Sequence, residues 1–372
     1  MNNNEFPITH IHIADIHFGA IDPEEQYNIL YDQFLKKISK IHFDILSIDG
    51  DLFDRKFIAS HKAVEYATMF VHRCAVLCEM RRASLIIISG TESHEAGQLS
   101  LFKDLSKIVN TQQIFIVESA TFIYTHGLKI LCLPDEYGKG EDYYAPLLNQ
   151  VYDACFMLGT LVGGVYGANN PDLNARRPVF GIDHFRGCKG PIIAGHVHEH
   201  MCLNKYMYYV SNPVRYKFGE ENEKGFGIVL QNRNGDHYYS FYPIISNRYD
   251  TIEISMLPGE DADGLVKRII DLKASIQGYL RVIISDISDL DGRLVTQYFR
   301  TDNTIKIVIQ RKNQADEPLI NTTEAIVNKY SGMEFLLDPN TDCYTKLSQY
   351  INHNEGYTFI SGDELRNIYN GK

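Results

Sequence analysis

Two short runs of aspartate and histidine are the residues of this sequence best suited to chemistry. The first is Asp15-Ile16-His17, and the second is Gly195-His196-Val197-His198. Because residues two apart in an extended strand point to the same side, Asp15 and His17 can reach one point in space. Carboxylate oxygens combined with imidazole nitrogens suit manganese, iron or zinc better than calcium. The two runs therefore predict a metal site.

Further candidate ligands follow two other apolar runs. Gly50 permits a tight turn that places Asp51 at the end of its strand, where the carboxylate can share the same ion. Asp54 follows closely, and the turn at 90–95 reads Gly-Thr-Glu-Ser-His-Glu. In α/β sheets the ligand crevice lies beyond the carboxyl ends of the strands, so these clusters are expected to meet there. One histidine alone is more often structural, but two such pairs at strand ends are hard to explain as independent packing features.

The elements that must position these side chains alternate between strands and helices up to about residue 133. Apolar runs of strand length lie at 8–13, 45–48, 85–89, 114–117 and 129–133, and amphipathic stretches lie at about 23–40, 60–82 and 98–109. Near-continuous β-branched runs such as 85–88 are typical of central strands that are buried on both faces. The order predicts an α/β fold with a sheet covered by helices.

The composition is that of a globular protein with more than one domain. The chain has 372 residues, of which 44% are hydrophobic and 22% are charged, so two domains with full cores are expected. A net charge of -11 disfavours a protein that coats nucleic acid generally, although a metal-bearing cleft can still hold phosphate. The seven cysteines form no CxxC pair, which fits a reducing cytoplasm. Because no apolar run approaches membrane-spanning length, a soluble, cytoplasmic protein without a membrane association is expected.

The order and spacing of these motifs resemble those of the calcineurin-like metallophosphoesterases. The residues that match are Asp15-x-His17, Gly50-Asp51-x-x-Asp54, the His-Glu pair of the turn at 90–95, and Gly195-His196-x-His198. The segment 209–215, followed by Phe218-Gly219-Glu220 and Lys224-Gly225-Phe226, is similar to SbcD-type DNA repair nucleases, and most of all to their phage-encoded relatives. The resemblance covers about the first 245 residues. It implies a metallophosphoesterase sandwich, a β-sheet core flanked by helices, as the nuclease domain over 1–248.

The resemblance also implies two divalent metal ions, with Mn²⁺ as the expected metal. The first ion would be held by Asp15, His17, Asp51 and His198. Asp51 would bridge to the second ion, which His196 also binds. His94 would stand beside the scissile phosphate and assist departure of the leaving oxygen, and Asp54 would orient a ligand or a neighbouring histidine.

The sequence departs from the family pattern at two places, both of which concern the second ion. The family turn Gly-Asn-His-Asp/Glu is longer here and lacks the asparagine, so Thr91, Glu92 or Ser93 would have to replace it. The choice among these three residues stays open, and Ser93 is the one that we name as a candidate ligand. The family histidine at the end of a later strand corresponds to Leu158, and His184 is the only nearby replacement, although a plain loop histidine is the simpler interpretation. The first site is therefore complete, and the second is depleted.

The remaining third of the chain is expected to form two further parts. Strands are predicted at 251–255, 279–285 and 304–310, and helices at about 261–276 and 289–300. These elements would form a smaller α+β capping domain over 249–337, which contacts DNA in the related nucleases. Short helices near 341–352 and 361–370 belong to a C-terminal helical segment, 338–372, that would dock a coiled-coil ATPase similar to SbcC. The resemblance further implies a homodimer.

Three functions from different classes account for these features. The first is a metal-dependent DNA nuclease subunit of an SbcCD-like repair or recombination complex, with double-strand exonuclease and single-strand endonuclease activity through metal-activated water. The second is a metallophosphatase or phosphodiesterase of another substrate class. The third is a catalytically weakened scaffold that binds DNA ends, which Leu158 and the altered turn support. We expect the first, working in the host cytoplasm if the chain is phage-encoded.

Overall fold

The computed structural model describes residues 7–310, apart from 96, 110–112, 137, 167–169, 172–177, 221, 247 and 277, together with residue 345. The chain divides into two compact units, Met1–Ile309 and Gln310–Lys372. The elements presented below belong to the first unit. The predicted docking segment at 338–372 lies, except for residue 345, outside the described residues.

The first sheet has six strands in the order β16-β15-β1-β2-β3-β4, of which β1 to β4 are parallel. β15 and β16 extend the other edge in antiparallel pairing. The strands are β1 Ile8–Ile13, β2 Ile45–Asp49, β3 Ser84–Ile88, β4 Ile114–Val117, β15 Lys224–Gln231 and β16 His237–Ile244. The four strands predicted up to residue 117 are therefore confirmed to within one residue.

The second sheet also has six strands, in the order β13-β14-β12-β7-β6-β5, and β14, β12, β7 and β6 are parallel. The strands are β5 Thr121–Thr125, β6 Leu128–Leu133, β7 Ala154–Leu158, β12 Ile192–Gly195, β13 Met201–Cys202 and β14 Met207–Tyr209. Two short pairs accompany it: β8 Thr160–Leu161 with β11 Val179–Phe180, and β9 Val165–Tyr166 with β10 Asn170–Pro171.

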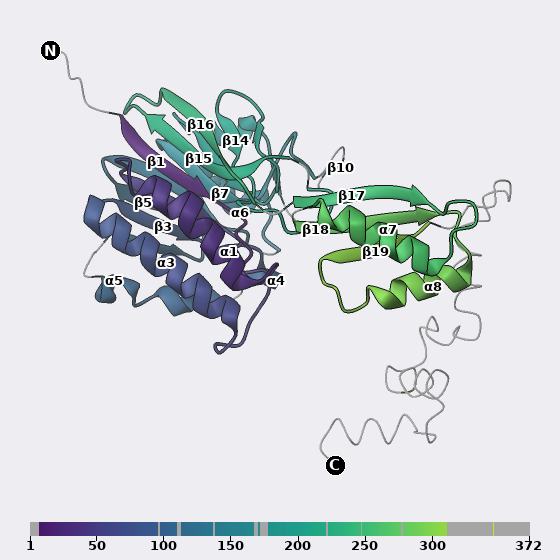
Figure 1. Ribbon diagram of the computed structural model, residues 1–372. Helices are drawn as coiled ribbons and strands as arrows, with labels where there is room; N and C mark the ends of the chain where they lie inside the picture. The colour runs from purple at the N-terminus through teal and green to yellow at the C-terminus, as the bar shows by residue number, and fades with distance from the viewer. Residues whose placement is uncertain are drawn as a thin grey trace. The chain divides into compact units, whose positions relative to one another are not determined.

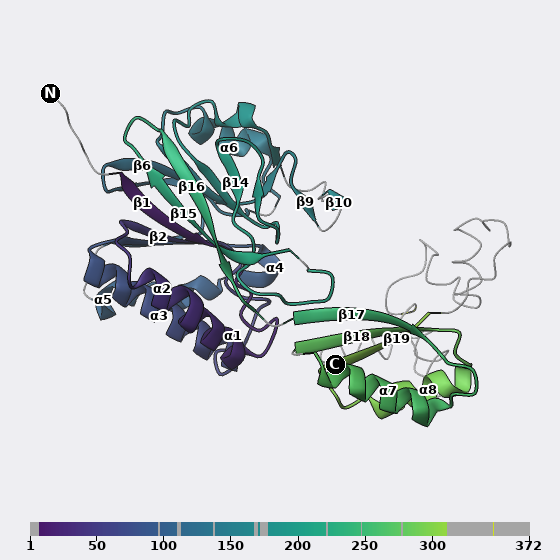
Figure 2. The same cartoon turned by 45° about the horizontal axis from the view of Figure 1, so that its top comes forward.

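The two sheets pack face to face, and helices cover their outer faces (Figure 1; Figure 2). Apolar side chains from both sheets, such as Ile86 and Phe156, form one core between them. A second core lies between the first sheet and the helices α1 (Pro23–Leu30) and α3 (Lys62–Arg81), and a third lies beneath α6 (Glu141–Leu148). The predicted α/β class is confirmed. The inner face of the first sheet is covered by the second sheet, however, and not by helices.

The helices begin where the local chemistry favours it. Asp22 caps α1 by accepting hydrogen bonds from the backbone N–H groups of Glu24 and Glu25, at 3.1 and 3.0 Å. The helix continues as a π-helical turn, which confirms the helical stretch predicted at 23–40. The remaining short elements of this part are η1 Tyr31–Leu35, α2 Lys36–Ile38, α4 Glu92–Glu95, η2 Gln98–Phe102, α5 Leu105–Ile108 and η3 Ile182–Phe185. The single helix predicted at 98–109 is thus two short helical turns.

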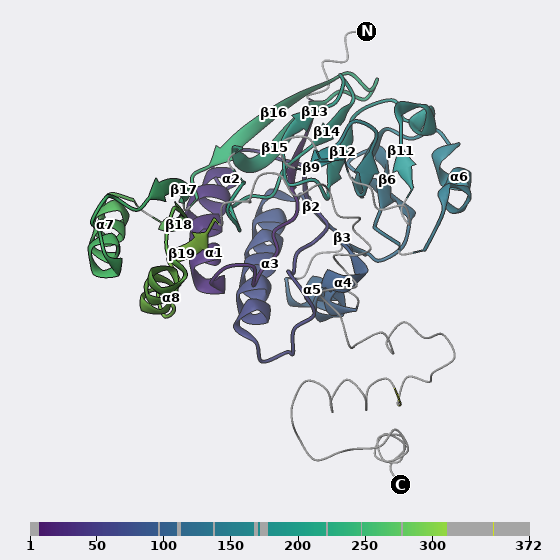
Figure 3. The ribbon, with the colours of Figure 1, turned by 90° about the vertical axis from the view of Figure 1, so that its right-hand side faces the viewer.

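The chain from 248 to 310 forms a three-stranded sheet with its own core. The strands β17 (Arg248–Ser255), β18 (Gly278–Ser285) and β19 (Ile305–Ile309) are all parallel. The helices α7 (Ala262–Ala274) and α8 (Asp289–Tyr298) lie on the same face of this sheet (Figure 3) and supply half of its core. The predicted elements are confirmed, but strands and helices alternate, which gives parallel pairing and not the expected α+β arrangement. Among the described helices, none has both the length and the apolar character needed to cross a membrane.

A matched pair of isoleucines tests the core of this small sheet. Ile284 on β18 is fully buried, whereas Ile270 on α7 is 42% exposed. Because the truncated side chain leaves a cavity, Ile284→Ala is expected to lower the free energy of unfolding by about 2–5 kcal/mol. Ile270→Ala should change it by no more than about 0.5 kcal/mol. Urea unfolding followed by circular dichroism measures both variants, and equal effects would contradict this placement of the core.

Candidate metal centre

The turns that follow β1, β2 and β12 are joined by hydrogen bonds from backbone N–H groups. The N–H of Asp15 donates to the carbonyl oxygen of Gly50 at 3.1 Å, and the N–H of His17 donates to that of Asp51 at 2.9 Å. From the second sheet, the backbone N–H of His196 donates to both carboxylate oxygens of Asp15, each at 2.9 Å. Residues that are far apart in the sequence therefore lie side by side where the carboxyl ends of the strands meet.

The backbone of this region is strained. Among the described residues, eight that are not glycine have a positive φ, and four of these are Asp15 (50°), His17 (48°), Asp51 (48°) and His196 (94°). Such conformations cost on the order of 1–3 kcal/mol each and concentrate at functional sites. Asp15 and His17 are thus brought together by left-handed turns beyond the end of β1, and not by the alternation of an extended strand that the sequence predicted.

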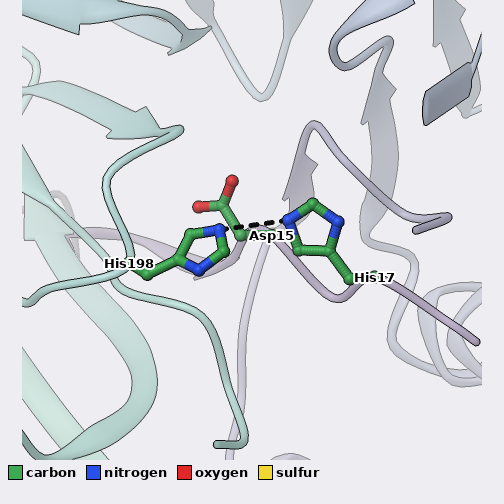
Figure 4. Close-up of side chains that lie close together, drawn as sticks. All are labelled: Asp15, His17 and His198. Carbon is green, nitrogen blue, oxygen red and sulfur yellow. Dashed lines mark hydrogen bonds between the residues drawn. The ribbon is translucent and has the colours of Figure 1, made fainter. Parts of the chain in front are cut away.

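Two histidines face each other through the same ring nitrogen. The Nε2 atoms of His17 and His198 are 3.1 Å apart, with the Asp15 carboxylate beside them (Figure 4). The Nδ1 atom of His198 is 3.2 Å from a carboxylate oxygen of Glu220, which can only accept a hydrogen bond, so Nδ1 carries the proton. In this tautomer, the Nε2 atom of His198 presents a lone pair to His17. Two ligands on one ion with bonds of about 2.0–2.1 Å are separated by about 2.9–3.4 Å, which fits this distance.

The side chains form two groups that could hold a metal ion, each with one ligand atom per residue and all atoms within 4.8 Å of one another. The first group is Asp15, His17 and His198, and the second is His17, Asp51 and His94. Three of the four predicted ligands of the first ion, Asp15, His17 and His198, thus form one group, and the fourth, Asp51, lies with His17 in the other.

Burial shapes the charge of these ligands. It raises the pKa of the Asp15 carboxyl well above its usual value, and the neighbouring Asp51 charge raises it further. It also lowers the pKa of His17 to about 4, against the opposing effect of Asp51, so the imidazole is neutral at pH 7 and able to bind a metal. Buried carboxylates beside neutral imidazoles suit a divalent cation, which would compensate their charge.

The turn after β3 supplies Thr91 to the site. Its backbone N–H donates to one carboxylate oxygen of Asp51 at 2.6 Å, and its hydroxyl donates to the other at 3.2 Å. Gly90 lies so close that a Cβ atom there would stand 2.2 Å from the backbone nitrogen of Asp51. Glu92 and Ser93 are exposed on α4. Of the three candidates for the missing asparagine, Thr91 is therefore the one that contacts Asp51.

His94 lies on the other side of His17. The Nδ1 atoms of the two rings are 3.2 Å apart. When Nε2 of His17 serves as a metal ligand, its Nδ1 carries the proton and donates to Nδ1 of His94. A neutral His94 then carries its own proton on Nε2. The pair thus sets the tautomer of His94 as well as its position.

Glu95 ties the turns after β2 and β3 together. One of its oxygens accepts from the backbone N–H groups of Leu52 and Phe53, and the other accepts from that of Gly90 at 2.6 Å. Burial and the Asp51 charge raise the pKa of Glu95 to about 8, although these N–H groups act in the opposite direction. In the sequence, Glu95 was noted only as part of the turn, because nothing local shows which backbone groups it reaches.

Two other residues that were predicted or considered also have contacts outside the two ligand groups. A carboxylate oxygen of Asp54 lies 2.9 Å from the guanidinium of Arg55, and the Asp54 charge also acts to raise the pKa of His17. The Nδ1 atom of His184 bonds the backbone of Gly181 in its own turn, and its Nε2 atom is 3.4 Å from Glu141. His184 thus has a local role in capping η3, as the simpler interpretation of the sequence expected.

Leu158 closes the inner end of the site with an aliphatic side chain. It pairs with Gly195 across β7 and β12, and its Cβ atom would stand 2.8 Å from a Cβ placed on Gly50. These two glycines directly precede His196 and Asp51. The last residue of β7 therefore offers no ligand atom to the site.

Three further residues that the sequence did not mark as site residues support the site. Tyr216 donates its hydroxyl hydrogen to the carbonyl oxygen of Asp15 at 2.7 Å. Glu220 contacts His198 as described above, and Lys224 donates to the His198 carbonyl oxygen at 2.6 Å. All three lie in the segment that the sequence matched to the related nucleases, but their contacts arise only when it folds back over the ligands.

The described residues thus contain aspartate and histidine clusters that could bind a metal ion. Comparison with protein-family models and with curated proteins finds no match for this chain. The candidate site is therefore assigned from its residues and their geometry.

Metal binding should stabilise the folded protein. An ion that binds only the folded state adds about 2.7 kcal/mol at a free concentration one hundred times its Kd. We expect Mn²⁺ to raise the melting temperature of the wild-type protein and a chelator to reverse the shift. Asp15→Asn should abolish the shift, whereas Asp183→Asn, at a side chain that is 82% exposed, should keep it. Scanning fluorimetry measures these shifts, and an unchanged response in Asp15→Asn would contradict the assigned ligand.

Glu95 should matter for stability as well as for the site. Glu95→Ala leaves buried N–H groups without an acceptor, and each such group costs about 1–3 kcal/mol. The variant is expected to lose at least about 2 kcal/mol of unfolding free energy and to bind Mn²⁺ more weakly. Glu92→Ala on the same helix removes an exposed carboxylate and should stay within about 0.5 kcal/mol. Chemical denaturation of the metal-free variants compares the two, and equal stability would refute the role of Glu95.

Proposed function

We propose that this protein is a metal-dependent phosphodiesterase with the metallophosphoesterase fold. The observation that carries the proposal is the convergence of the Nε2 atoms of His17 and His198 beside Asp15. These ligands lie beyond the carboxyl ends of strands from two packed sheets, where α/β folds place their ligand sites. The two-sheet sandwich with outer helices agrees with the architecture that the resemblance implies.

The substrate that we propose is DNA, in a repair or recombination nuclease of the SbcD type. Support comes from the segment at 209–226, which resembles those nucleases in sequence and supplies Tyr216, Glu220 and Lys224 to the site. The coiled-coil ATPase partner, the homodimer and the capping role of 249–337 belong to the same proposal.

Each residue of the site has a distinct task in this reaction. Asp15, His17, Asp51 and His198 would hold the first divalent ion, for which we propose Mn²⁺. When bound, such an ion polarises the phosphoryl group and makes water acidic enough to act as a nucleophile near neutral pH. Thr91 holds the Asp51 carboxylate in place with two hydrogen bonds.

His94 is proposed as the group that stabilises the charge on the leaving oxygen. Its Nδ1 atom is occupied by His17, so the N–H group at its Nε2 atom is available to donate a hydrogen bond. A donor fixed in this tautomer does not have to reorganise when charge develops on the leaving oxygen. Bond cleavage then requires no covalent intermediate with the protein.

The second ion fits the structure less well than the first. Asp51 and His196 would hold it, with Thr91 as the nearest replacement for the family asparagine. Leu158 contributes no ligand atom, so a weakly held second ion and slow hydrolysis are part of the proposal. The same observation favours a second candidate function, a scaffold that binds DNA ends and has lost most of its catalytic power.

His94 allows the nuclease proposal to be tested directly. His94→Ala is expected to reduce Mn²⁺-dependent cleavage of DNA by about 100-fold or more, because loss of one hydrogen-bond donor to a developing oxyanion costs about 10²–10³-fold, while the bound metal stays nearly unchanged. His72→Ala, at an exposed histidine of α3, should leave both unchanged. Mass spectrometry of the bound metal and gel assays of cleavage measure the two effects. Loss of metal in His94→Ala would show that His94 is a ligand instead.

The same assays separate the candidate functions. Wild-type protein should cleave duplex and single-stranded DNA with Mn²⁺ far faster than it hydrolyses an aryl phosphate monoester. A preference for the monoester would favour a phosphatase. One tightly bound ion without cleavage of either substrate, even with the ATPase partner present, would favour the scaffold.

A further inference from the structure

A buried carboxylate stands behind the candidate ligand His198. Glu220 lies in the loop before β15, and its side chain is only 8% exposed. One of its oxygens is 3.2 Å from Nδ1 of His198, and the other accepts the backbone N–H of Tyr216 at 2.8 Å. Both oxygens are thus engaged on the protein side of the imidazole, away from Nε2.

A buried lysine accompanies this carboxylate. The side chain of Lys224, at the start of β15, is 2% exposed. Its ammonium donates to the carbonyl oxygen of His198 at 2.6 Å and to the side-chain oxygen of Asn212 at 2.7 Å, and it lies 4.0 Å from Glu220. A buried ammonium persists only when it is paired and hydrogen-bonded, so these contacts define its position.

The charges of the pair are complementary. Glu220 supplies an acidic group and Lys224 a basic one, and both side chains are almost wholly buried. The loop therefore encloses them as a pair. The same loop carries Tyr216, whose hydroxyl holds the backbone of Asp15. One segment thus supports ligands from β1 and from β12 together.

We infer that Glu220 is a positioning residue for the candidate metal centre. Its carboxylate fixes the ring orientation and the tautomer of His198, and Lys224 holds Glu220 and the His198 backbone in place. This inference rests on the proposed function, because it concerns how tightly the proposed site binds its metal ion. A carboxylate behind a ligating imidazole makes the nitrogen at the metal a stronger donor, and loss of such a partner typically weakens metal binding 10–100-fold.

A conservative substitution separates this role from packing. Glu220→Gln keeps the size of the side chain but removes its charge, and it is expected to weaken Mn²⁺ binding by about 10–100-fold with little change in the melting temperature of the metal-free protein. Glu223→Gln, on the same loop at an exposed position, removes the same charge and should leave the affinity within about twofold of wild type. Calorimetric titration of full-length protein with Mn²⁺ measures all three affinities.

A second measurement on the wild-type protein covers the case in which Glu220→Gln does not fold. Nitrogen NMR of the metal-free protein at neutral pH, assigned with a His198→Gln variant, should show the His198 proton on Nδ1. A proton on Nε2 would overturn the inference.

The outcomes for the two proposals differ. Wild-type protein that binds Mn²⁺ while Glu220→Gln binds equally well would overturn the role of Glu220 and leave the proposed function standing. Wild-type protein that binds no divalent metal would instead overturn the proposed function, and the assignment of Glu220 to a metal centre with it.

Discussion

Two carboxylates, Asp15 and Asp51, are buried beside His17 where the two sheets meet, and the rest of the site depends on these acidic groups being held away from water. Burial and mutual repulsion raise the pKa of Asp15, so a cation is the natural counterpart of the cluster. Below it, Asp49 pairs with His12 at 2.8 Å in the core between the sheets. A buried aspartate–histidine pair thus lies near the two carboxylates of the site.

Close approach of the backbones makes this arrangement possible. A Cβ on Gly90 would collide with the backbone of Asp51, and a Cβ on Gly195 would stand 2.4 Å from the carbonyl oxygen of Asp49. Glycine therefore allows the two sheets and the turn after β3 to meet at van der Waals distance. The left-handed conformations of the ligands follow from the same crowding, because each chain must turn sharply as it leaves its strand.

The ligands are then held from two sides. Glu95 fastens the turns of the first sheet to one another, and the loop with Tyr216 and Glu220 fastens the turn after β1 to the turn after β12. Both supports use buried carboxylates with two or more hydrogen-bond partners, which costs desolvation but gives a defined geometry. A site assembled in this way can keep its ligands in place before any ion binds.

Much of the fold followed from the sequence, because strand length, apolar periodicity and helix caps are local properties. The positions of Asp15, Asp51 and His198 at strand ends followed in the same way, since residue type and the preceding apolar run suffice to mark them. Tertiary structure alone decided the rest. Contacts between distant segments decide which element covers the inner face of the first sheet. They also decide whether Thr91 or Ser93 reaches Asp51, and they place Glu220 behind His198. No periodic pattern in the sequence predicts such contacts, because they are formed by turns whose directions are set only when the two sheets pack together.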